Sequence, residues 1–270
     1  MTDPEITSEI TPEITVEPDG PTSGVLSWRS GQAYDLQTLT QAIGSTAGAV
    51  LSAAGLQRLE VDVRADDLVA RRALMRSGFR LEGTRRRAIV GESGELIDQL
   101  IFARLNDDRV DGPDGFSGVM NSALPRKRLI AHVLMRDVAG RILLCDTMFK
   151  TDWELPGGIV EPYESPRQGA IREVKEELGI DIQLGRLLAV DWMPPYLGWD
   201  DAEELIFDGG TVTEPEIEAY VLQATEIRSV QLITVEEAEP HLTALSFRRL
   251  SAILALDAER TLTMEDGRPV

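Results

Sequence analysis

The segment from Ser165 to Gly179, SPRQGAIREVKEELG, constrains the fold more than any other part of this sequence. Ser165 followed by Pro166 and Gln168 is typical of a capped helix start with proline in the first turn. A glycine in the position of Gly179 is typical of a helix end. Apolar residues recur between these caps at helical spacing, and they predict a helix whose buried face consists of Ala170, Ile171, Val174 and Leu178.

Three glutamates lie on another face of this predicted helix. From Glu173, the other two, Glu176 and Glu177, lie three and four residues further on, a spacing that brings helical side chains together. Like charges at this spacing destabilise an isolated helix by about 0.2–0.5 kcal/mol per pair. Carboxylates without sulfur or imidazole suit a hard cation, so the cluster beside the turn Gly157-Gly158 indicates Mg²⁺ or Mn²⁺. The alternative is an ordinary solvated helix, because glutamates are common on such helices.

The charge and the scarcity of cysteine and histidine exclude several kinds of site. The formal charge of −19 disfavours nucleic acid and anionic membranes as partners, because both repel an acidic surface. Cys145 is the single cysteine and cannot form an intramolecular disulfide, and His132 and His241 alone cannot complete a zinc cluster. The sequence starts without a basic segment followed by an apolar core, and no run approaches ~18 apolar residues. We therefore expect a cytoplasmic protein.

Composition shifts predict five regions in a chain of the α/β (α+β) class. Residues 1–24 are acidic and rich in Thr and Pro, so we expect a disordered tail, with a role in interactions as the alternative. Residues 25–105 combine helical and strand-like periodicity and predict a small α/β module. Residues 106–125 begin with Asp, Gly and Pro and predict a linker. We expect a second domain over residues 126–260 and a frayed tail over 261–270.

The glutamate helix belongs to a longer pattern that resembles a known signature. From Gly158 to Ile180 the sequence follows G-x5-E-x7-R-E-V-x-E-E-x-G-I, which is similar to the signature of the Nudix hydrolase family. The preceding segment WELPGG, from Trp153 to Gly158, also resembles that family. The resemblance extends from about Arg126 to Ala258. It implies a mixed sheet between helices and Mg²⁺-dependent hydrolysis of a nucleoside diphosphate linked to another group.

The resemblance also implies a role for each residue of the pattern. It implies that Glu173, Glu176 and Glu177 bind the metal together with the carbonyl of Gly157. It assigns Arg172 to the orientation of these carboxylates, so that Glu173, Arg172 and Glu176 form the catalytic group. The remaining pattern residues are structural: Gly158, Glu164, which would brace the loop to the helix, and Gly179.

Two features of the expected site stay open. The general base is either one of the helix glutamates or a carboxylate from a later loop, with four candidates: Glu203, Glu204, Glu218 and Glu226. In the segment DWMPPYLGW, the rings of Trp192, Tyr196 and Trp199 could stack on a nucleobase, and Glu203 could bind substrate nearby. Ordinary packing is the alternative for each ring.

The first module resembles a different family. The segment from Gly55 to Leu105, with its SGFRLEG turn, is similar to the C-terminal half of a GNAT acetyltransferase. The glycine-rich loop that would bind the pyrophosphate of acetyl-CoA is missing, and Asp67 stands where that family usually has Asn. We therefore expect a truncated module that does not transfer acetyl groups. Too few residues precede its first helix for further strands, so its open edge should dock on the second domain or pair in a homodimer.

These features support two functions of different classes. The first is a Mg²⁺-dependent pyrophosphohydrolase acting on a nucleoside diphosphate derivative. The second is a Nudix-fold module that senses a nucleotide or nucleotide-sugar without hydrolysing it. A sensor could dispense with the metal carboxylates, and because the sequence retains all of them, the enzyme is favoured. A third hypothesis, in which the first module is the working domain, is opposed by the missing cofactor loop.

Overall fold

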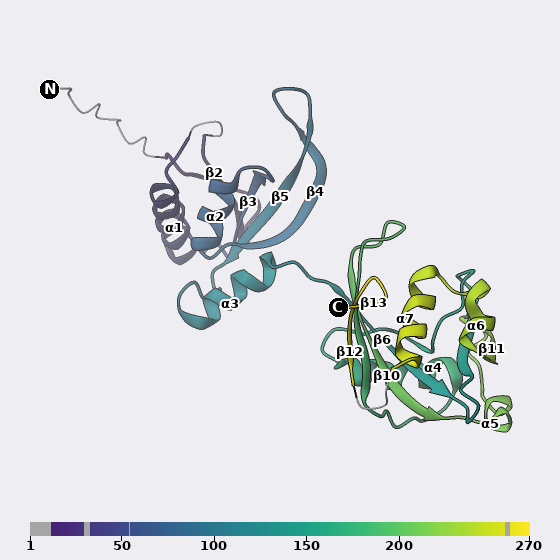
Figure 1. Ribbon diagram of the computed structural model, residues 1–270. Helices are drawn as coiled ribbons and strands as arrows, with labels where there is room; N and C mark the ends of the chain where they lie inside the picture. Colours follow the sequence, from purple (N-terminus) through teal and green to yellow (C-terminus); the bar gives the residue numbers. More distant parts are fainter. Residues whose placement is uncertain (1–11, 30–32, 54, 257–259) are drawn as a thin grey trace. The chain divides into compact units, whose positions relative to one another are not determined.

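The computed structural model describes residues 12–29, 33–53, 55–256 and 260–270 (Figure 1). The chain divides into two compact units, Met1–Pro125 and Arg126–Val270. Within the described residues, the helices are all too short or too polar to cross a membrane.

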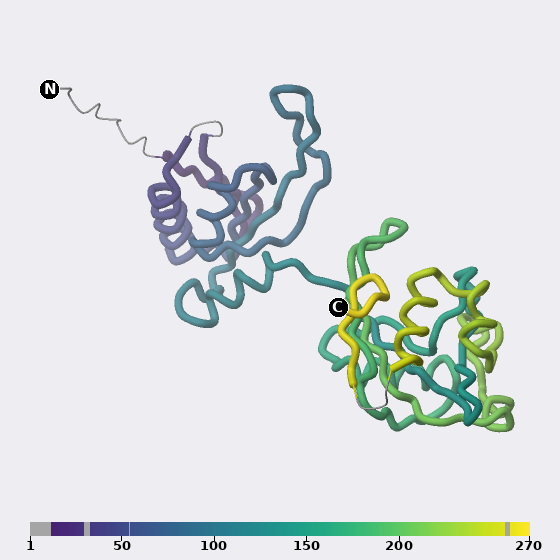
Figure 2. Tube along the Cα trace, in the orientation of Figure 1, coloured from purple at the N-terminus to yellow at the C-terminus, as the bar shows by residue number. Residues whose placement is uncertain are grey.

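The first unit contains a five-stranded sheet in the order β1-β2-β3-β5-β4. Strands β2 and β3 are parallel, and the other neighbours are antiparallel. The β4–β5 hairpin is long and extends past the helices (Figures 1 and 2). The elements are β1 (Thr15–Pro18), β2 (Ser23–Ser27), α1 (Leu36–Ala53), β3 (Arg58–Arg64), α2 (Leu68–Arg76), β4 (Arg80–Val90), β5 (Leu96–Leu105) and α3 (Gly112–Ala123).

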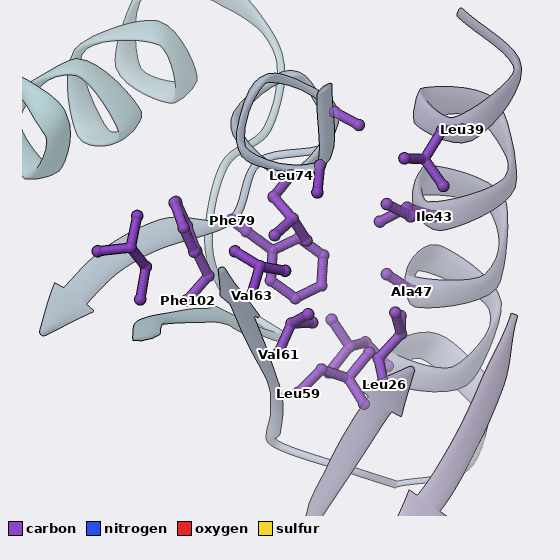
Figure 3. Close-up of a cluster of buried hydrophobic side chains, with 14 residues drawn as sticks. Leu26, Leu39, Ile43, Ala47, Leu59, Val61, Val63, Leu74, Phe79 and Phe102 are labelled. Carbon is purple, nitrogen blue, oxygen red and sulfur yellow. The ribbon is translucent and has the colours of Figure 1, made fainter. Parts of the chain in front are cut away.

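The core of this unit lies between α1, α2 and one face of the sheet (Figure 3). Alternate residues of β3 point into it, and α1 contributes side chains one turn apart, as the two periodicities predict. The aromatic rings of Phe79 and Phe102 fill the space beneath α2. The opposite face of the sheet carries ion pairs, including Arg58 with Glu82 and Arg85 with Asp62.

Two predictions for the first unit are wrong. Residues 15–18 and 23–27 form strands, although the tail was expected to be disordered up to residue 24 and no strand was expected before the first helix. Leu26 is buried in the core, so these short strands are stabilised by pairing and burial despite their polar composition. Residues 1–11 lie outside the described part of the chain.

The expected linker over residues 106–125 is also corrected, because it contains α3. Val119 of this helix is buried, and Ser122 Oγ accepts a hydrogen bond from the Leu81 N–H at 3.0 Å. Pro113 lies in the first turn, where proline is tolerated in a helix. The Gly and Asp residues that suggested a linker therefore form the start of a helix that packs beside β4.

The second unit contains an eight-stranded mixed sheet in the order β11-β7-β6-β10-β9-β12-β13, with β8 paired to β6. Strand β6 is parallel to β10 and β9 is parallel to β12. Its strands are β6 (Arg128–Arg136), β7 (Ile142–Thr147), β8 (Gly157–Ile159), β9 (Leu187–Met193), β10 (Ala202–Thr211), β11 (Ile227–Ile233), β12 (Leu262–Glu265) and β13 (Arg268–Pro269). Its helices are α4 (Pro166–Leu178), α5 (Glu214–Glu218), α6 (Val235–Ala238), the 3-10 turn η1 (Glu239–His241) and α7 (Ala244–Leu254).

Helices α4 and α7 pack on opposite faces of this sheet. Along β6, Ala131 and Val133 belong to the core that includes α4, whereas Leu134 belongs to the core that includes α7. We refer to these two sides as the α4 face and the α7 face. This alternation assigns every residue of a paired strand to one face.

Strands β6 and β7 diverge, and the segment that precedes α4 lies between them. They pair at Arg136 and Ile142, but further along Glu154 bridges to Cys145 of β7 and β8 pairs with β6. In the β6–β8 pair, Gly157 lies opposite His132. The glycine turn is therefore built into the sheet.

The predicted frayed tail over residues 261–270 is wrong as well. Residues 262–265 form β12 beside β9 (Figure 2). In the turn that follows, the Gly267 N–H donates to Asp191 at 3.1 Å. Met264 is buried in the α7 core. The polar composition suggested a tail, but the segment is held by strand pairing and by one buried apolar side chain.

Candidate active site

The helix α4 has the caps that its sequence predicts. Ser165 and Gln168 form a reciprocal capping box, in which Gln168 Oε1 accepts the Ser165 N–H at 2.9 Å. Gly179 has φ 72, in the left-handed region, and ends the helix. The local sequence therefore fixes where the helix that carries the glutamates begins and ends.

Arg172 connects the glutamates of the helix to the preceding loop. Its Nη1 lies 2.9 Å from Glu173 and 3.0 Å from Glu176, and its Nη2 lies 2.8 Å from Glu164. Nη2 also donates to the carbonyl of Ile159 at 3.0 Å. The guanidinium hydrogen bonds lower the pKa of Glu164. This one cation offsets the repulsion between the clustered carboxylates and ties the helix to β8.

Glu177 lies beneath the glycine turn. It is 5% exposed, and its Oε2 accepts the Gly157 N–H at 2.8 Å. Burial raises the pKa of Glu177 to about 7, although the Gly157 N–H acts in the opposite direction. Gly157 has φ 131, and a Cβ there would lie 2.3 Å from the carbonyl oxygen of Ala131, so only glycine fits.

Glu173 packs against the second glycine of the turn. A Cβ on Gly158 would lie 2.9 Å from Glu173 Cδ. Burial raises the pKa of Glu173, and the charges of Glu176 and Glu226 raise it further. Glu226 therefore lies close to this cluster, and its backbone carbonyl accepts the Met148 N–H at 2.7 Å.

The other base candidates lie elsewhere. Glu204 is 2% exposed on the α7 face, where it contacts His132 and Arg249. Burial alone would raise the pKa of Glu204, but the two cationic partners outweigh burial and lower it to about 2. Glu218 is exposed at the end of α5. Among the four candidates, Glu226 is the one whose charge contributes to the raised pKa of Glu173.

The β9–β10 hairpin carries the predicted substrate-binding residues. Trp192 pairs with Glu203 across β9 and β10, so both side chains belong to the α4 face. Tyr196 pairs with Trp199 beyond the ends of these two strands. Tyr196 is 64% and Trp199 is 58% exposed. The hairpin projects beyond the sheet (Figure 1).

Polar residues that the sequence did not single out hold these rings. Trp192 Nε1–H donates to Asp201 Oδ2 at 3.1 Å, and Lys127 also pairs with Asp201. The guanidinium of Arg128 lies 4.8 Å from the centre of the Trp199 ring. Arg128 is the first residue of β6, whereas Lys127 and Asp201 lie just before β6 and β10, and their sequence neighbourhood carries no motif.

The oxygen-rich donor set fits a hard cation in chemistry. Glu173, Glu176 and Glu177 lie along α4 beside the Gly157-Gly158 turn, and Glu177 has no cationic side chain bonded to it within the described residues. In the same part of the chain, no three acidic, His or Cys side chains converge on one point, because Arg172 holds Glu173 and Glu176. A cation would therefore compete with the Arg172 hydrogen bonds.

The comparison with protein families identifies this part of the chain. Residues 126–253 match the model of the NUDIX domain. They form a Nudix domain. The predicted Nudix fold is thereby confirmed for these residues, within a chain that combines helices and mixed sheets.

Similar proteins cover part of the Nudix domain. Over 65 residues the chain is 43% identical to "CTP pyrophosphohydrolase" of Escherichia coli. The matched stretch covers 23% of this chain and 47% of that protein. Over 86 residues it is 36% identical to "Diphosphoinositol polyphosphate phosphohydrolase 3-alpha" of Homo sapiens. This stretch covers 32% of this chain and 47% of that protein. The chain thus spans about half the length of the curated relatives it matches.

Among solved structures, the Nudix domain is similar to the MutT protein from Methanosarcina mazei Go1. The match has a TM-score of 0.41 and 26% sequence identity, and it covers 50% of this chain and 100% of that one.

Proposed function

We propose that the Nudix domain hydrolyses a phosphoanhydride bond in a nucleoside diphosphate linked to another moiety. The observation that carries the proposal is the arrangement around Arg172, which joins Glu164, Glu173 and Glu176 beside a turn whose glycines admit no side chain. The named activities of the two relatives, a pyrophosphohydrolase and a phosphohydrolase, support this class of reaction.

Each residue of the signature has a proposed role. Glu173, Glu176, Glu177 and the carbonyl of Gly157 would hold Mg²⁺ or Mn²⁺. When bound, such an ion neutralises charge on phosphoryl oxygens and activates water. Arg172 orients the Glu173 and Glu176 carboxylates through hydrogen bonds, and Glu164 braces Arg172 against the loop.

We propose Glu226 as the general base. It lies close enough to Glu173 to raise the pKa of that group, and its segment is fixed by the bond between the Gln223 N–H and the carbonyl of Glu177 at 3.0 Å. A carboxylate held there can accept the proton of an attacking water. Glu173 and Glu176 are the alternatives within the helix, and both keep a hydrogen bond from Arg172 in this structure.

The nucleoside would lie along the β9–β10 hairpin. Trp192 lies on the α4 face, Tyr196 and Trp199 expose their rings near the tip of the hairpin, and Glu203 lies across from Trp192 with an acceptor-only carboxylate. Stacking of a base on an exposed ring is sequence-tolerant and contributes about 1–3 kcal/mol. Packing alone does not account for Tyr196 and Trp199, because both are mostly exposed.

The first unit is proposed as an accessory, GNAT-like module that does not transfer acetyl groups. The segment where a cofactor loop would lie, SGQAYD, has no glycine-rich pattern. A cytoplasmic location and a small-molecule partner in place of nucleic acid are parts of the same proposal, supported by the acidic charge and the single cysteine. A homodimer is proposed because the sheet of the first unit ends in the edge strands β1 and β4.

A non-catalytic nucleotide sensor is the second candidate function. The observation in its favour is that Arg172 binds the two carboxylates that a metal would need. A phosphate-release screen separates the two candidates. It uses Mg²⁺ with normal and oxidised nucleoside triphosphates, ADP-ribose, NADH, nucleotide sugars and dinucleoside polyphosphates, with Glu177→Gln as the blank.

Turnover of one substrate class above the blank supports the enzyme and names its substrate. Silence across the panel, with tight nucleotide binding measured by calorimetry, supports the sensor.

A further inference from the structure

The α7 face of the Nudix domain contains a buried cluster of four ionisable side chains. His132, Asp191, Glu204 and Arg249 are each 7% exposed or less. His132 Nδ1 lies 2.8 Å from Glu204 Oε1, and Arg249 Nη2 lies 2.7 Å from the same oxygen. Arg249 Nη1 lies 3.2 Å from Asp191 Oδ2. The cluster thus joins β6, β10, β9 and α7.

Such a cluster is an inefficient way to stabilise a core. Desolvation of buried ions offsets most of their attraction, and apolar residues of similar volume are often equally or more stabilising. The surrounding positions on this face are apolar, including Leu134 of β6 and Ile206 of β10. Arg249 Nε has no hydrogen-bond partner among the described residues, so the pairing is also incomplete. Stability by itself therefore does not explain the cluster.

One end of the cluster touches the active-site turn. His132 lies opposite Gly157 in the β6–β8 pair, and a Cβ on Gly157 would lie 2.8 Å from Cδ2 of the His132 ring. Gly157 in turn donates its N–H to Glu177. Glu204 fixes the ring by accepting a hydrogen bond from the His132 Nδ1–H, and Arg249 fixes Glu204. A continuous series of contacts thus runs from Arg249 to Glu177.

The other end of the cluster is held by the C-terminal hairpin. Asp191 accepts the Gly267 N–H through both carboxylate oxygens, at 3.1 and 3.2 Å. The neighbouring Arg248 also contacts this hairpin, through the carbonyl of Asp266 at 2.8 Å, but no contact of the described residues links it to Glu204. Arg248 and Arg249 therefore share a helix and a hairpin and differ in whether they join the cluster.

We propose that Glu204 and Arg249 are positioning residues for the active site: they fix the His132 ring, which holds Gly157 against Glu177. The C-terminal hairpin completes the arrangement by holding Asp191. This proposal rests on the proposed function for its consequence, since Gly157 and Glu177 are there assigned to the metal. Its structural content, the order of the Gly157 backbone, is measurable without turnover.

The test compares Glu204→Leu, Arg249→Met and the paired Glu204→Leu/Arg249→Met variant of the full chain. Arg141→Met is the matched control, because it removes an arginine of the same domain that pairs with Asp137 and Glu214 and not with the cluster or the C-terminal hairpin. Glu204→Gln is measured alongside as a folded variant that keeps the shape of the side chain. Three quantities are recorded: the melting midpoint, amide hydrogen exchange over Gly157–Ile159, and Mn²⁺ binding by electron paramagnetic resonance.

The paired variant separates positioning from stability. It should melt closer to the wild-type midpoint than Arg249→Met, because Glu204 and Arg249 are removed together and Asp191 alone loses its arginine. Exchange over Gly157–Ile159 should nevertheless be faster while the amides of α4 and β7 stay protected, and Mn²⁺ binding should weaken about 10–100-fold, the usual effect of removing a supporting residue. Arg141→Met should leave both quantities unchanged.

The proposal is overturned if amide exchange over Gly157–Ile159 in the paired variant is as slow as in the wild type. If the paired variant does not fold, the same result in Glu204→Gln overturns it. Faster exchange together with no Mn²⁺ binding in the wild-type protein would leave positioning intact and reject the metal-dependent function instead.

Discussion

Glu177 and Glu204 are two buried glutamates in one small domain, and their environments shift their pKa values in opposite directions. Glu177 is 5% exposed and bonds to a backbone N–H, and burial raises its pKa to about 7. Glu204 is 2% exposed, yet Arg249 and His132 overcome the effect of burial and lower its pKa to about 2. Burial is therefore nearly equal, and the difference comes from cationic partners.

This difference separates a carboxylate that can take a ligand from one that is already satisfied. A buried carboxylate without a cation is costly, and a bound metal ion would relieve that cost. A carboxylate that is paired on all sides has nothing to gain from a metal. Glu177, beside the α4 face, is thus a carboxylate that a cation can bind, and we call it the open carboxylate. Glu204, on the α7 face, already has cationic partners, and we call it the closed carboxylate.

Removing the open carboxylate should have the largest effect. Glu177→Gln should lower hydrolysis more than about 100-fold, because loss of a direct ligand should exceed the effect of losing a supporting residue. In metal-free buffer the same variant should melt about 2–4 °C higher, equivalent to roughly 1 kcal/mol, because the buried charge is gone. Steady-state kinetics and a thermal melt measure the two effects.

The control for Glu177→Gln is Glu236→Gln, which changes an exposed glutamate of α6. A chelator should abolish the activity of the wild-type enzyme and of this control alike. An active Glu177→Gln enzyme would rule out the metal assignment and would make the two buried glutamates equivalent in function.

Replacing Arg249 should make Glu204 resemble Glu177, because Glu204 would then be a buried carboxylate without an arginine partner. Arg249→Met leaves Glu204 and Asp191 buried without their shared arginine, and one-sided removal of a buried partner costs about 3–5 kcal/mol. Urea unfolding of the full chain, followed in the Nudix domain, measures this loss. Equal stability of Arg249→Met and Arg248→Met would show that the buried pairing carries no energetic weight.

The sequence predicts the α4 face better than the α7 face, for a physical reason. The caps of α4 and the shared face of Glu173, Glu176 and Glu177 depend on spacings of three or four residues, which local geometry converts into contacts. The contacts of Glu204 with Arg249 and His132 join three distant segments. No local pattern marks such residues, because their burial depends on how the sheet is assembled.

Short edge strands escaped prediction for a related reason. Residues 15–18 and 262–265 are polar or acidic in composition and were expected to be disordered or frayed. Each is held by hydrogen bonds to a neighbouring strand and by few buried side chains, such as Met264. Pairing of this kind depends on a partner far away in the sequence, so composition underestimates it.

Acidification should sharpen the comparison by discharging the closed carboxylate. The folded-state pKa of Glu204 is depressed, so its contribution to stability is fully present above the unfolded value, about 4.3. That contribution is lost as the pH falls from about 4.3 towards about 2. The paired Glu204→Leu/Arg249→Met variant should lose less stability than the wild type over this range, by on the order of 1–3 kcal/mol. Parallel curves for the two proteins in urea titrations at successive pH values would contradict the depressed pKa.

The smallest expected effect concerns the aromatic hairpin that would bind the nucleoside. Trp199 is mostly exposed, and Arg128 already covers part of its ring, so Trp199→Ala should weaken substrate binding by only about 1 kcal/mol. This predicts a KM about fivefold higher with little change in kcat, because stacking acts on the ground state and the transition state alike. Phe116→Ala, an exposed aromatic in the first unit, is the matched control. A change confined to kcat would show that Trp199 acts in the chemical step, like the metal-binding residues, and not by stacking on the nucleobase. The open carboxylate and the aromatic hairpin would then not differ in function.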